Sequence, residues 1–261
     1  MTINKLVVQK YGGSSLSSTD KISNVAEKII SKTKQGYMVV VVVSAMGDST
    51  DNLISLASKV NANSNSLTRE MDILLSTGEL VSSTLMTMSL IAKNKKAISL
   101  SGVQAGIKTD SVHGSARISD ININRIQEEL SKGSIVVVAG FQGLNNLGDV
   151  TTLGRGGSDT TAVALAVALN AERCEIYTDV EGIYTTDPRI TKNARKLNEI
   201  SFEEMLEMAS LGAKMNPRSI ELGLVYNMPV YVASSFSSEK GTLIHRSSNM
   251  EIRKAVTGIA V

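Results

Sequence analysis

The chain has 261 residues, which is long enough to bury a sizeable core as one large α/β domain or as two lobes. The formal net charge is only +2 and aromatic residues make up 3%, so neither charge nor base stacking favours nucleic-acid binding. The single cysteine, Cys174, excludes an internal disulfide, no secretory signal precedes Leu6, and no apolar run approaches the roughly 20 residues that span a bilayer. We therefore expect a cytoplasmic protein that binds neither nucleic acid nor membrane.

The first half of the chain alternates between predicted strands and helices. Strands are predicted at residues 6–9 and 38–43, and the second is an apolar, largely β-branched run typical of a central parallel strand covered on both faces. Apolar periodicity and end signals predict helices over residues 20–36, after residues 44–50, over 71–75 and from Glu79 to about residue 93. A polar loop is expected at residues 61–66.

The same alternation continues in the second half. Strands are predicted at residues 97–100, 135–140, 174–179 and 230–233, and helices at residues 122–132 and 158–169. A further helix is expected to start at Ser201, because Glu204 completes a capping box with it. Repeated strand–helix units favour an α/β sheet wrapped by helices.

A glycine-rich turn at residues 151–162 runs directly into a predicted helix. Backbone N–H groups at a helix start have no partners inside the helix, and the helix dipole favours negative charge there. Arg155 can grip a carboxylate or a phosphate, but Asp159 cannot bind an anion. An acid inside an apparent anion site indicates that it organises cations.

Three more loops leave predicted strands with small and polar residues, at 10–15, 44–50 and 179–189. Ligands of such sheets bind at the carboxyl ends of the strands, so these loops are expected to gather there. The cations Lys10 and Arg155, with several glycine N–H groups, suit a polyphosphate and an anionic second substrate. The chain contains neither a P-loop nor the protein-kinase motifs, and its two histidines have no metal-ligand spacing.

Several motifs in order resemble those of the aspartate kinases, within the amino acid kinase family. They are Lys10-Tyr11-Gly12-Gly13-Ser14-Ser15, Ser44-Ala45-Met46-Gly47-Asp48, Ser76-Thr77-Gly78-Glu79, Phe141-Gln142-Gly143, residues 153–161, Tyr177-Thr178-Asp179-Val180-Glu181-Gly182 and Thr186-Asp187-Pro188-Arg189. The likeness covers nearly the whole chain. Each motif alone is weak, whereas the ordered set is highly specific.

The resemblance implies a three-layer αβα sandwich with a mainly parallel central sheet. It implies ATP-dependent phosphorylation of the side-chain carboxylate of L-aspartate to 4-phospho-L-aspartate, which begins lysine, threonine and methionine synthesis. An N-terminal lobe, residues 1–150, would hold the amino acid, and a C-terminal lobe, 151–250, the nucleotide. Residues 251–261 resemble the lead into paired ACT regulatory domains, which this sequence lacks, so it is either a piece of a longer protein or a naturally short form. A homodimer through the N-terminal lobe is expected.

The resemblance also implies roles for particular residues. The catalytic residues would be Lys10, Asp159 and Lys214, with Asp159 holding the two lysines on the transferring phosphoryl group. The residues that bind aspartate would be Ser44, Thr50, Glu79, Arg155 and Ser158, with Glu79 on the α-amino group and Arg155 on the α-carboxylate. The residues that bind the nucleotide would be Lys10, Tyr11, Gly12, Gly13, Thr178, Asp179, Tyr184, Arg189 and Lys214. Mg²⁺ is expected to bind the ATP phosphates, and no protein ligand is assigned to it.

Each role has a structural alternative. Asp159 could only cap its helix, Glu79 could be an ordinary first-turn glutamate, and Lys214 could be a solvated helix-end lysine. His113 is interpreted as a polar loop residue and Cys174 as a buried strand residue. Two other functions stay open: a related kinase acting on glutamate, acetylglutamate, carbamate or UMP, and a non-catalytic nucleotide-binding or storage module.

Overall fold

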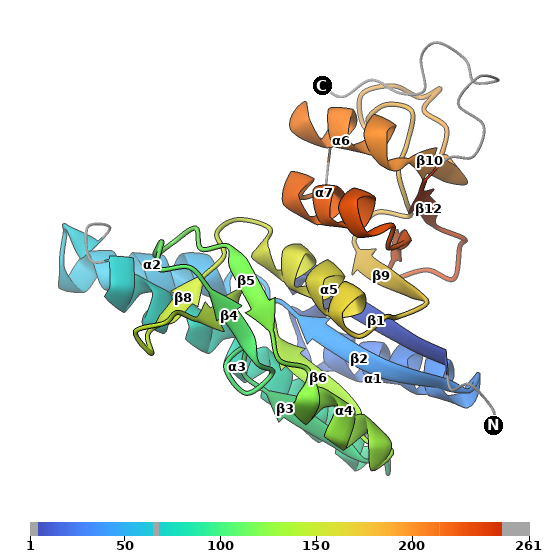
Figure 1. Cartoon of the computed structure of the whole chain (residues 1–261). Coiled ribbons are helices and arrows are strands. Elements are labelled where there is room, and N and C mark those ends of the chain that lie inside the picture. Colours follow the sequence, from blue (N-terminus) through green and yellow to red (C-terminus); the bar gives the residue numbers. More distant parts are fainter. Residues whose placement is uncertain (1–4, 65–67, 214, 247–261) are drawn as a thin grey trace.

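An eight-stranded sheet forms the centre of the molecule, in the order β10-β12-β11-β9-β1-β2-β6-β3 (Figure 1). The computed structural model describes residues 5–64, 68–213 and 215–246. The strands are β1 (Lys5–Tyr11), β2 (Tyr37–Val43), β3 (Ala97–Leu100), β6 (Ile135–Ala139), β9 (Arg173–Thr178), β10 (Glu199–Ser201), β11 (Val230–Ser234) and β12 (Thr242–His245). All neighbouring strands run parallel except β11 and β12. The expected α/β fold with a mainly parallel sheet is confirmed.

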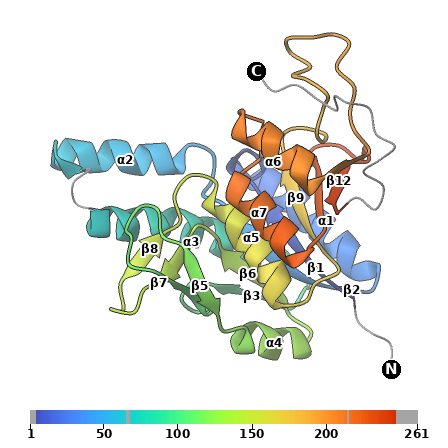
Figure 2. The ribbon, with the colours of Figure 1, turned by 45° about the horizontal axis from the view of Figure 1, so that its top comes forward.

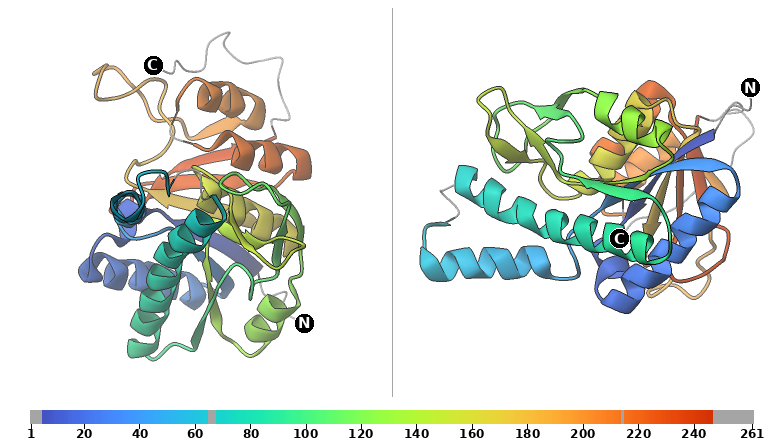
Figure 3. Two further views of the ribbon diagram at one scale, coloured as in Figure 1. Left: turned by 90° about the vertical axis from the view of Figure 1, so that its left-hand side faces the viewer. Right: turned by 90° about the horizontal axis from the view of Figure 1, so that it is seen from below.

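Helices cover both faces of this sheet (Figures 1 and 3). The helices are α1 (Thr19–Lys34), α2 (Ser49–Val60), α3 (Thr68–Ala92), α4 (Asn124–Ser131), α5 (Gly157–Ala168), α6 (Phe202–Ser210) and α7 (Pro217–Tyr226). The side chains of α1 and α3 pack with Val39 and Val41 of β2, whereas those of α4, α5, α6 and α7 pack in a second cluster with Val40 and Val42. Strand β2 is therefore buried from both sides, as its β-branched run predicts.

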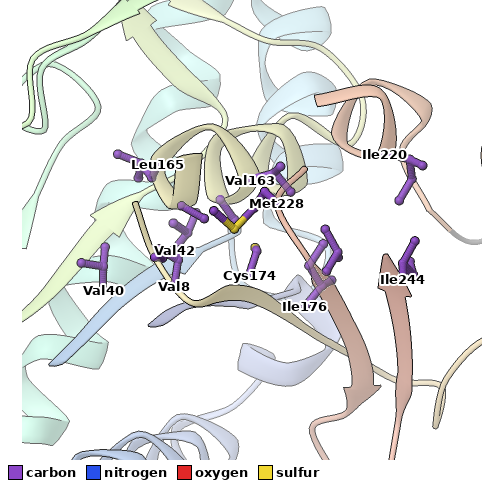
Figure 4. Close-up of a cluster of buried hydrophobic side chains, with 14 of the residues drawn as sticks. Val8, Val40, Val42, Val163, Leu165, Cys174, Ile176, Ile220, Met228 and Ile244 are labelled. Carbon is purple, nitrogen blue, oxygen red and sulfur yellow. The ribbon is translucent and has the colours of Figure 1, made fainter. Parts of the chain in front are cut away.

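The core between the sheet and α5 is almost purely aliphatic (Figure 4). Val8, Val42 and Cys174 come from three adjacent strands and are fully buried with Val163 and Leu165 of α5. Burial raises the pKa of the Cys174 thiol far above its ordinary value, which keeps it protonated and unreactive. The interpretation of Cys174 as a buried strand residue is confirmed.

A second sheet of four short strands lies beside the large one, in the order β5-β4-β7-β8. Its strands are β4 (Ile107–Thr109), β5 (Ile118–Ile121), β7 (Gln142–Leu144) and β8 (Val150–Thr152). Strand β7 follows β6 almost directly, and β8 leads into α5 through the glycine-rich turn. No pattern in the sequence predicted this sheet, which holds the start of the glycine-rich turn through β8.

Helix α3 is continuous from Thr68 to Ala92, which corrects the prediction that a helix begins at Glu79. Gly78 lies within this helix, at a position where the neighbouring loop leaves no room for a side chain. A Cβ atom at Gly78 would lie 2.8 Å from the Cβ atom of Ala45, so glycine allows α3 to approach the loop after β2. Glu79 is consequently a mid-helix residue, and the alternative that it is an ordinary first-turn glutamate is wrong.

Helix α3 is also long and apolar enough, by length and composition, to cross a membrane. It packs against α1, β6 and β8, and its buried face includes Asp72, Ser76, Glu79, Ser83 and Met86. Those contacts are typical of a core helix that passes the same length and hydropathy test. Helix α2 has no buried residue, lies beside α3 and extends away from the large sheet (Figure 2).

Candidate active site

A cavity of about 550 Å³ opens at the carboxyl ends of β1, β2 and β6. Strand β1 lies between β2, the next strand in the chain, and β9, which enters the sheet much later. Such a reversal of strand order leaves a crevice at the strand ends, where α/β proteins bind their ligands. The walls include α2, α3 and the glycine-rich turn. The cavity brings together eight of the predicted site residues, which are Lys10, Gly13, Ser44, Thr50, Glu79, Arg155, Ser158 and Asp159.

Lys10 and Asp159 form an ion pair on the inner side of the cavity. The Lys10 Nζ atom lies 2.7 Å from Asp159 Oδ1, and both side chains are largely buried, at 12% and 14% exposed. Lys10 comes from β1, and Asp159 lies in the first turn of α5, whose N-cap is Gly156 without a side-chain cap. Asp159 therefore holds a cation beside a helix N-terminus, and capping does not explain it.

Glycines follow Lys10 where the loop after β1 packs against the loop after β2. Gly47 N donates a hydrogen bond to Gly13 O over 3.0 Å, and a Cβ atom at Gly13 would lie 2.7 Å from Ala45 O. A Cβ atom at Gly12 would lie 3.5 Å from Lys10 Nζ. A Cβ atom at Gly12 would make only an ordinary contact, whereas a larger residue at Gly13 would push the two loops apart, so Gly13 is the glycine that their close packing requires.

Glu79 presents a buried carboxylate with one oxygen unpartnered. The N–H of Ala45 donates to Glu79 Oε1 over 3.0 Å, whereas Oε2 has no hydrogen-bond partner in the described structure. Burial raises the pKa of Glu79 to about 7, against the opposing effect of the Ala45 hydrogen bond. A buried, unpartnered carboxylate oxygen on a cavity wall suits a ligand that brings a positive charge.

Arg155 lines the same cavity, in a turn that depends on two glycines with left-handed backbone. Gly154 and Gly156 have φ of +76° and +74°, and a Cβ atom at Gly156 would lie 2.2 Å from Asn216 Nδ2. Asn216 holds the turn by donating to Arg155 O over 2.8 Å. Within the described residues, no hydrogen bond or ion pair is found for the Arg155 guanidinium, which leaves it available for an anion.

The residues with hydroxyl groups that were predicted to bind aspartate lie around the same cavity. Ser44 follows β2, and its carbonyl accepts a hydrogen bond of 2.7 Å from Ser82 on α3, which anchors the loop. Thr50 lies in the first turn of α2, and Ser158 is buried in the first turn of α5. All three hydroxyl-bearing residues line the cavity.

The remaining nucleotide candidates lie outside this cavity, around the end of β9. Tyr11 is fully buried and its ring stacks on Tyr177, so its side chain is part of the core. Gly12 N donates to Tyr177 O over 3.3 Å, which places the end of β1 next to the end of β9, where Thr178 and Asp179 follow.

Tyr184 and Arg189 belong to the long loop after β9. Tyr184 pairs with Lys196 in an isolated β-bridge, and Arg189 forms an ion pair with Asp187 of its own loop while its side chain stays 86% exposed. The predicted second lysine, Lys214, lies outside the described residues. No cluster of three His, Cys, Asp or Glu residues suited to a metal ion is found in the described part of the chain.

Sequence reasoning missed Asp72 and Asn216, which hold the cavity walls together. Asp72 is almost fully buried, lines the cavity and accepts hydrogen bonds from β8 of the small sheet and from the loop between β4 and β5. Its position seven residues before Glu79 places both acids on one face of α3, a spacing that could have indicated it. Asn216 before Pro217 carries an N-cap signal for α7, which was also missed.

Comparison with known proteins gives consistent matches. Residues 5–234 match the model of the amino acid kinase family. The chain is 53% identical to an aspartokinase of Geobacillus stearothermophilus over 98% of this chain and 62% of that protein. It resembles the crystal structure of an aspartate kinase from Synechocystis with a TM-score of 0.82 at 46% identity, covering 94% of this chain and 40% of that one.

A second similar structure is E. coli aspartokinase III in complex with aspartate and ADP. Its TM-score is 0.80 at 30% identity, covering 94% of this chain and 66% of that one. The chain thus spans 62% of the length of the Geobacillus relative.

Proposed function

Because the chain belongs to the amino acid kinase family, we propose that it transfers the γ-phosphoryl group of ATP to the side-chain carboxylate of L-aspartate. The product would be 4-phospho-L-aspartate, at the start of lysine, threonine and methionine synthesis. One observation carries the proposal: a single cavity unites the Lys10–Asp159 ion pair with the unpartnered Oε2 atom of Glu79 and the accessible Arg155. The identity with named aspartokinases supports aspartate over other acids.

The amino acid would bind by its two charged α-substituents. Arg155 would donate hydrogen bonds from its guanidinium group to the α-carboxylate, and Glu79 Oε2 would accept one from the α-ammonium group. Ser44 and Ser158 would add hydrogen bonds. An acetylated amine carries no charge for Glu79, so this arrangement favours a free amino acid over acetylglutamate.

The phosphoryl transfer itself would depend on positioning and charge neutralisation. An aspartate side chain is already ionised near neutral pH, so no general base is needed and the task is to bring two anions together. Lys10, with the main-chain N–H groups around Gly12 and Gly13, would neutralise charge on the phosphates, and Asp159 would hold the ammonium in place. Lys214 is proposed as the second cation. Mg²⁺ on the ATP phosphates would supply further charge neutralisation.

The rest of the nucleotide would extend toward β9. We assign its binding to Thr178, Asp179, Tyr184 and Arg189, together with the backbone of Tyr11. In this proposal residues 1–150 supply most of the amino-acid site and residues 151–250 the nucleotide site, although Arg155 and Ser158 reach across that division. A cytoplasmic location is part of the same proposal.

An ATP-dependent hydroxamate assay of the purified chain with aspartate, glutamate and acetylglutamate tests the function. We expect acyl phosphate from aspartate alone. Product from another acid would indicate a related kinase, and no product from any acid would favour the non-catalytic binding module.

Substitutions of the ion pair test the site. Lys10→Ala and Asp159→Ala are expected to lower turnover by roughly 10²–10³, the usual loss for a preorganised charge donor. Lys93 and Glu27 form a surface ion pair of the same 2.7 Å length far from the cavity, and Lys93→Ala is the matched control. Near-normal turnover of a folded Lys10 or Asp159 variant would contradict the assigned roles.

We also propose a homodimer through α3. Leu80, Met88 and Ile91 are exposed and, by helical spacing, share one face of α3 with Thr84. An apolar stripe on the outer face of a core helix is typical of a subunit contact. Light scattering should show a dimer for the chain and a monomer for Met88→Glu, and an unchanged mass would contradict this interface.

A further inference from the structure

Asp72 binds the small sheet to the helix that carries Glu79. Its side chain is 1% exposed. One carboxylate oxygen accepts a hydrogen bond from Thr152 Oγ1, the other lies 2.7 Å from His113 Nδ1, and the Gly114 N–H lies 3.1 Å from both. A carboxylate can only accept, so all three partners donate to it. Each oxygen of this buried acid is therefore satisfied, unlike Oε2 of Glu79.

The three donors come from the end of β8 and from the loop with Gly114, and these two segments contact the part of the glycine-rich turn that carries Arg155. Thr152 ends β8, and Arg155 follows three residues later. The loop with Gly114 packs on the start of the turn, because a Cβ atom at Gly154 would lie 3.1 Å from Gly114 O. The same loop is joined to β8, since Ala116 N donates to Thr152 O over 2.9 Å. Asp72 thus holds both supports of the turn against α3.

We propose that Asp72 is a positioning residue that sets the span between the Glu79 carboxylate and the Arg155 guanidinium. This inference rests on the proposed function, in which these two groups hold the ammonium and carboxylate of one amino acid. Both substituents are on the same carbon, so the span has a single correct length. If the span changes, aspartate can no longer satisfy both groups at once, so it binds more weakly. The Lys10–Asp159 pair makes no contact with Asp72 and would keep its geometry.

The substitution Asp72→Asn tests the proposal with little change in volume. Its amide oxygen can still accept from Thr152, but its NH₂ group faces the Gly114 N–H, donor against donor. We expect the KM for aspartate to rise about tenfold or more, while kcat and the KM for ATP change less than about threefold. Thr109→Val is the matched control, since it removes a buried 2.6 Å hydrogen bond to Thr151 within the small sheet and leaves the Asp72 contacts in place. The control should leave the KM for aspartate near normal.

A purely structural role would instead lower kcat and affect both substrates together, and that outcome would overturn the proposal. His113→Ala provides a second, milder variant because this side chain is partly exposed. It should raise the KM for aspartate in the same way, and the double variant with Asp72→Asn should add little to the single changes. An additive double variant would also count against the proposal.

Amide hydrogen exchange gives a readout that does not depend on activity. In Asp72→Asn the amides of residues 113–116 and 153–157 should exchange faster, while those at the centre of β2 stay protected. If the wild-type chain phosphorylates no amino acid, the proposed function fails, yet this measurement still decides whether Asp72 holds the turn. Unchanged exchange in both segments would refute the positioning role itself.

Discussion

The substitution Glu79→Gln should stabilise the ligand-free protein at alkaline pH while removing its affinity for aspartate. Glu79 is 4% exposed, and its pKa rises from the ordinary 4.5 to about 7 on folding. Between those values the folded protein retains a proton that the unfolded chain has already released, so stability falls as pH rises through this window. Each tenfold change in proton affinity is worth about 1.4 kcal/mol, which gives a loss of roughly 3 kcal/mol by pH 8.

Glutamine stays neutral throughout, so its variant avoids that loss. Its unpartnered NH₂ group carries a desolvation cost of about 1–3 kcal/mol, but that cost is the same at every pH. The difference in unfolding free energy between variant and wild type should therefore shift in favour of the variant by about 2–3 kcal/mol from pH 5 to pH 8. In a domain of this size that corresponds to a relative change in melting temperature of about 5–10 °C.

Thermal or urea unfolding at pH 5, 6, 7 and 8 measures this shift directly. Glu27→Gln is the control, because Glu27 is exposed and Lys93 lowers its pKa, so its variant should show no gain at alkaline pH. At pH 8, aspartate should raise the melting temperature of wild type but not of Glu79→Gln. A difference between variant and wild type that is constant from pH 5 to pH 8 would refute the reasoning about the buried carboxylate.

Three further outcomes follow from the contacts described. In wild type, kcat/KM for aspartate should fall about tenfold per pH unit below pH 7 as Glu79 takes up a proton, and a flat profile measured in steady-state assays would exclude Glu79 as the ammonium-binding group. Gly78→Ala should destabilise the fold by about 1–2 kcal/mol in urea titrations. Its methyl group would clash with the Ala45 side chain, and the cost of that clash should exceed the gain in helix propensity from replacing glycine by alanine. A stabilised variant would contradict the packing of α3 on the loop after β2. Lys32→Met breaks a 2.7 Å ion pair with the buried Glu175 and should cost about 2–4 kcal/mol of stability with unchanged kcat, whereas reduced turnover would connect that pair to the site.

Most of the large sheet could be predicted from the sequence. The run at residues 38–43 is β-branched on both faces because β2 is covered by helices on both sides, so burial and local preference agree. The Ser201–Glu204 capping box also forms as predicted, because its hydrogen bonds are local. Strands β4, β5, β7 and β8 have three or four residues each, which is too few for a recognisable alternation, and they were missed.

The error at Glu79 has a different cause. Gly78 interrupts the helical pattern, and glycine within a helix usually signals a boundary. Its actual reason is the close approach of Ala45, a residue in another part of the chain. No local pattern contains that information.

The sequence by itself determined most of the large sheet with its crossing helices, the glycine-rich turns and the chemical types of the side chains at the strand ends. These features follow from the periodicity of apolar residues and from the backbone freedom of glycine, and both depend only on residues close together in the sequence. Only the tertiary structure decided that Lys10 pairs with Asp159, that Glu79 lacks a partner for one oxygen, and that Asp72 joins the small sheet to α3. Those properties depend on desolvation and on contacts between distant segments, which exist only once the sheet has brought the segments together.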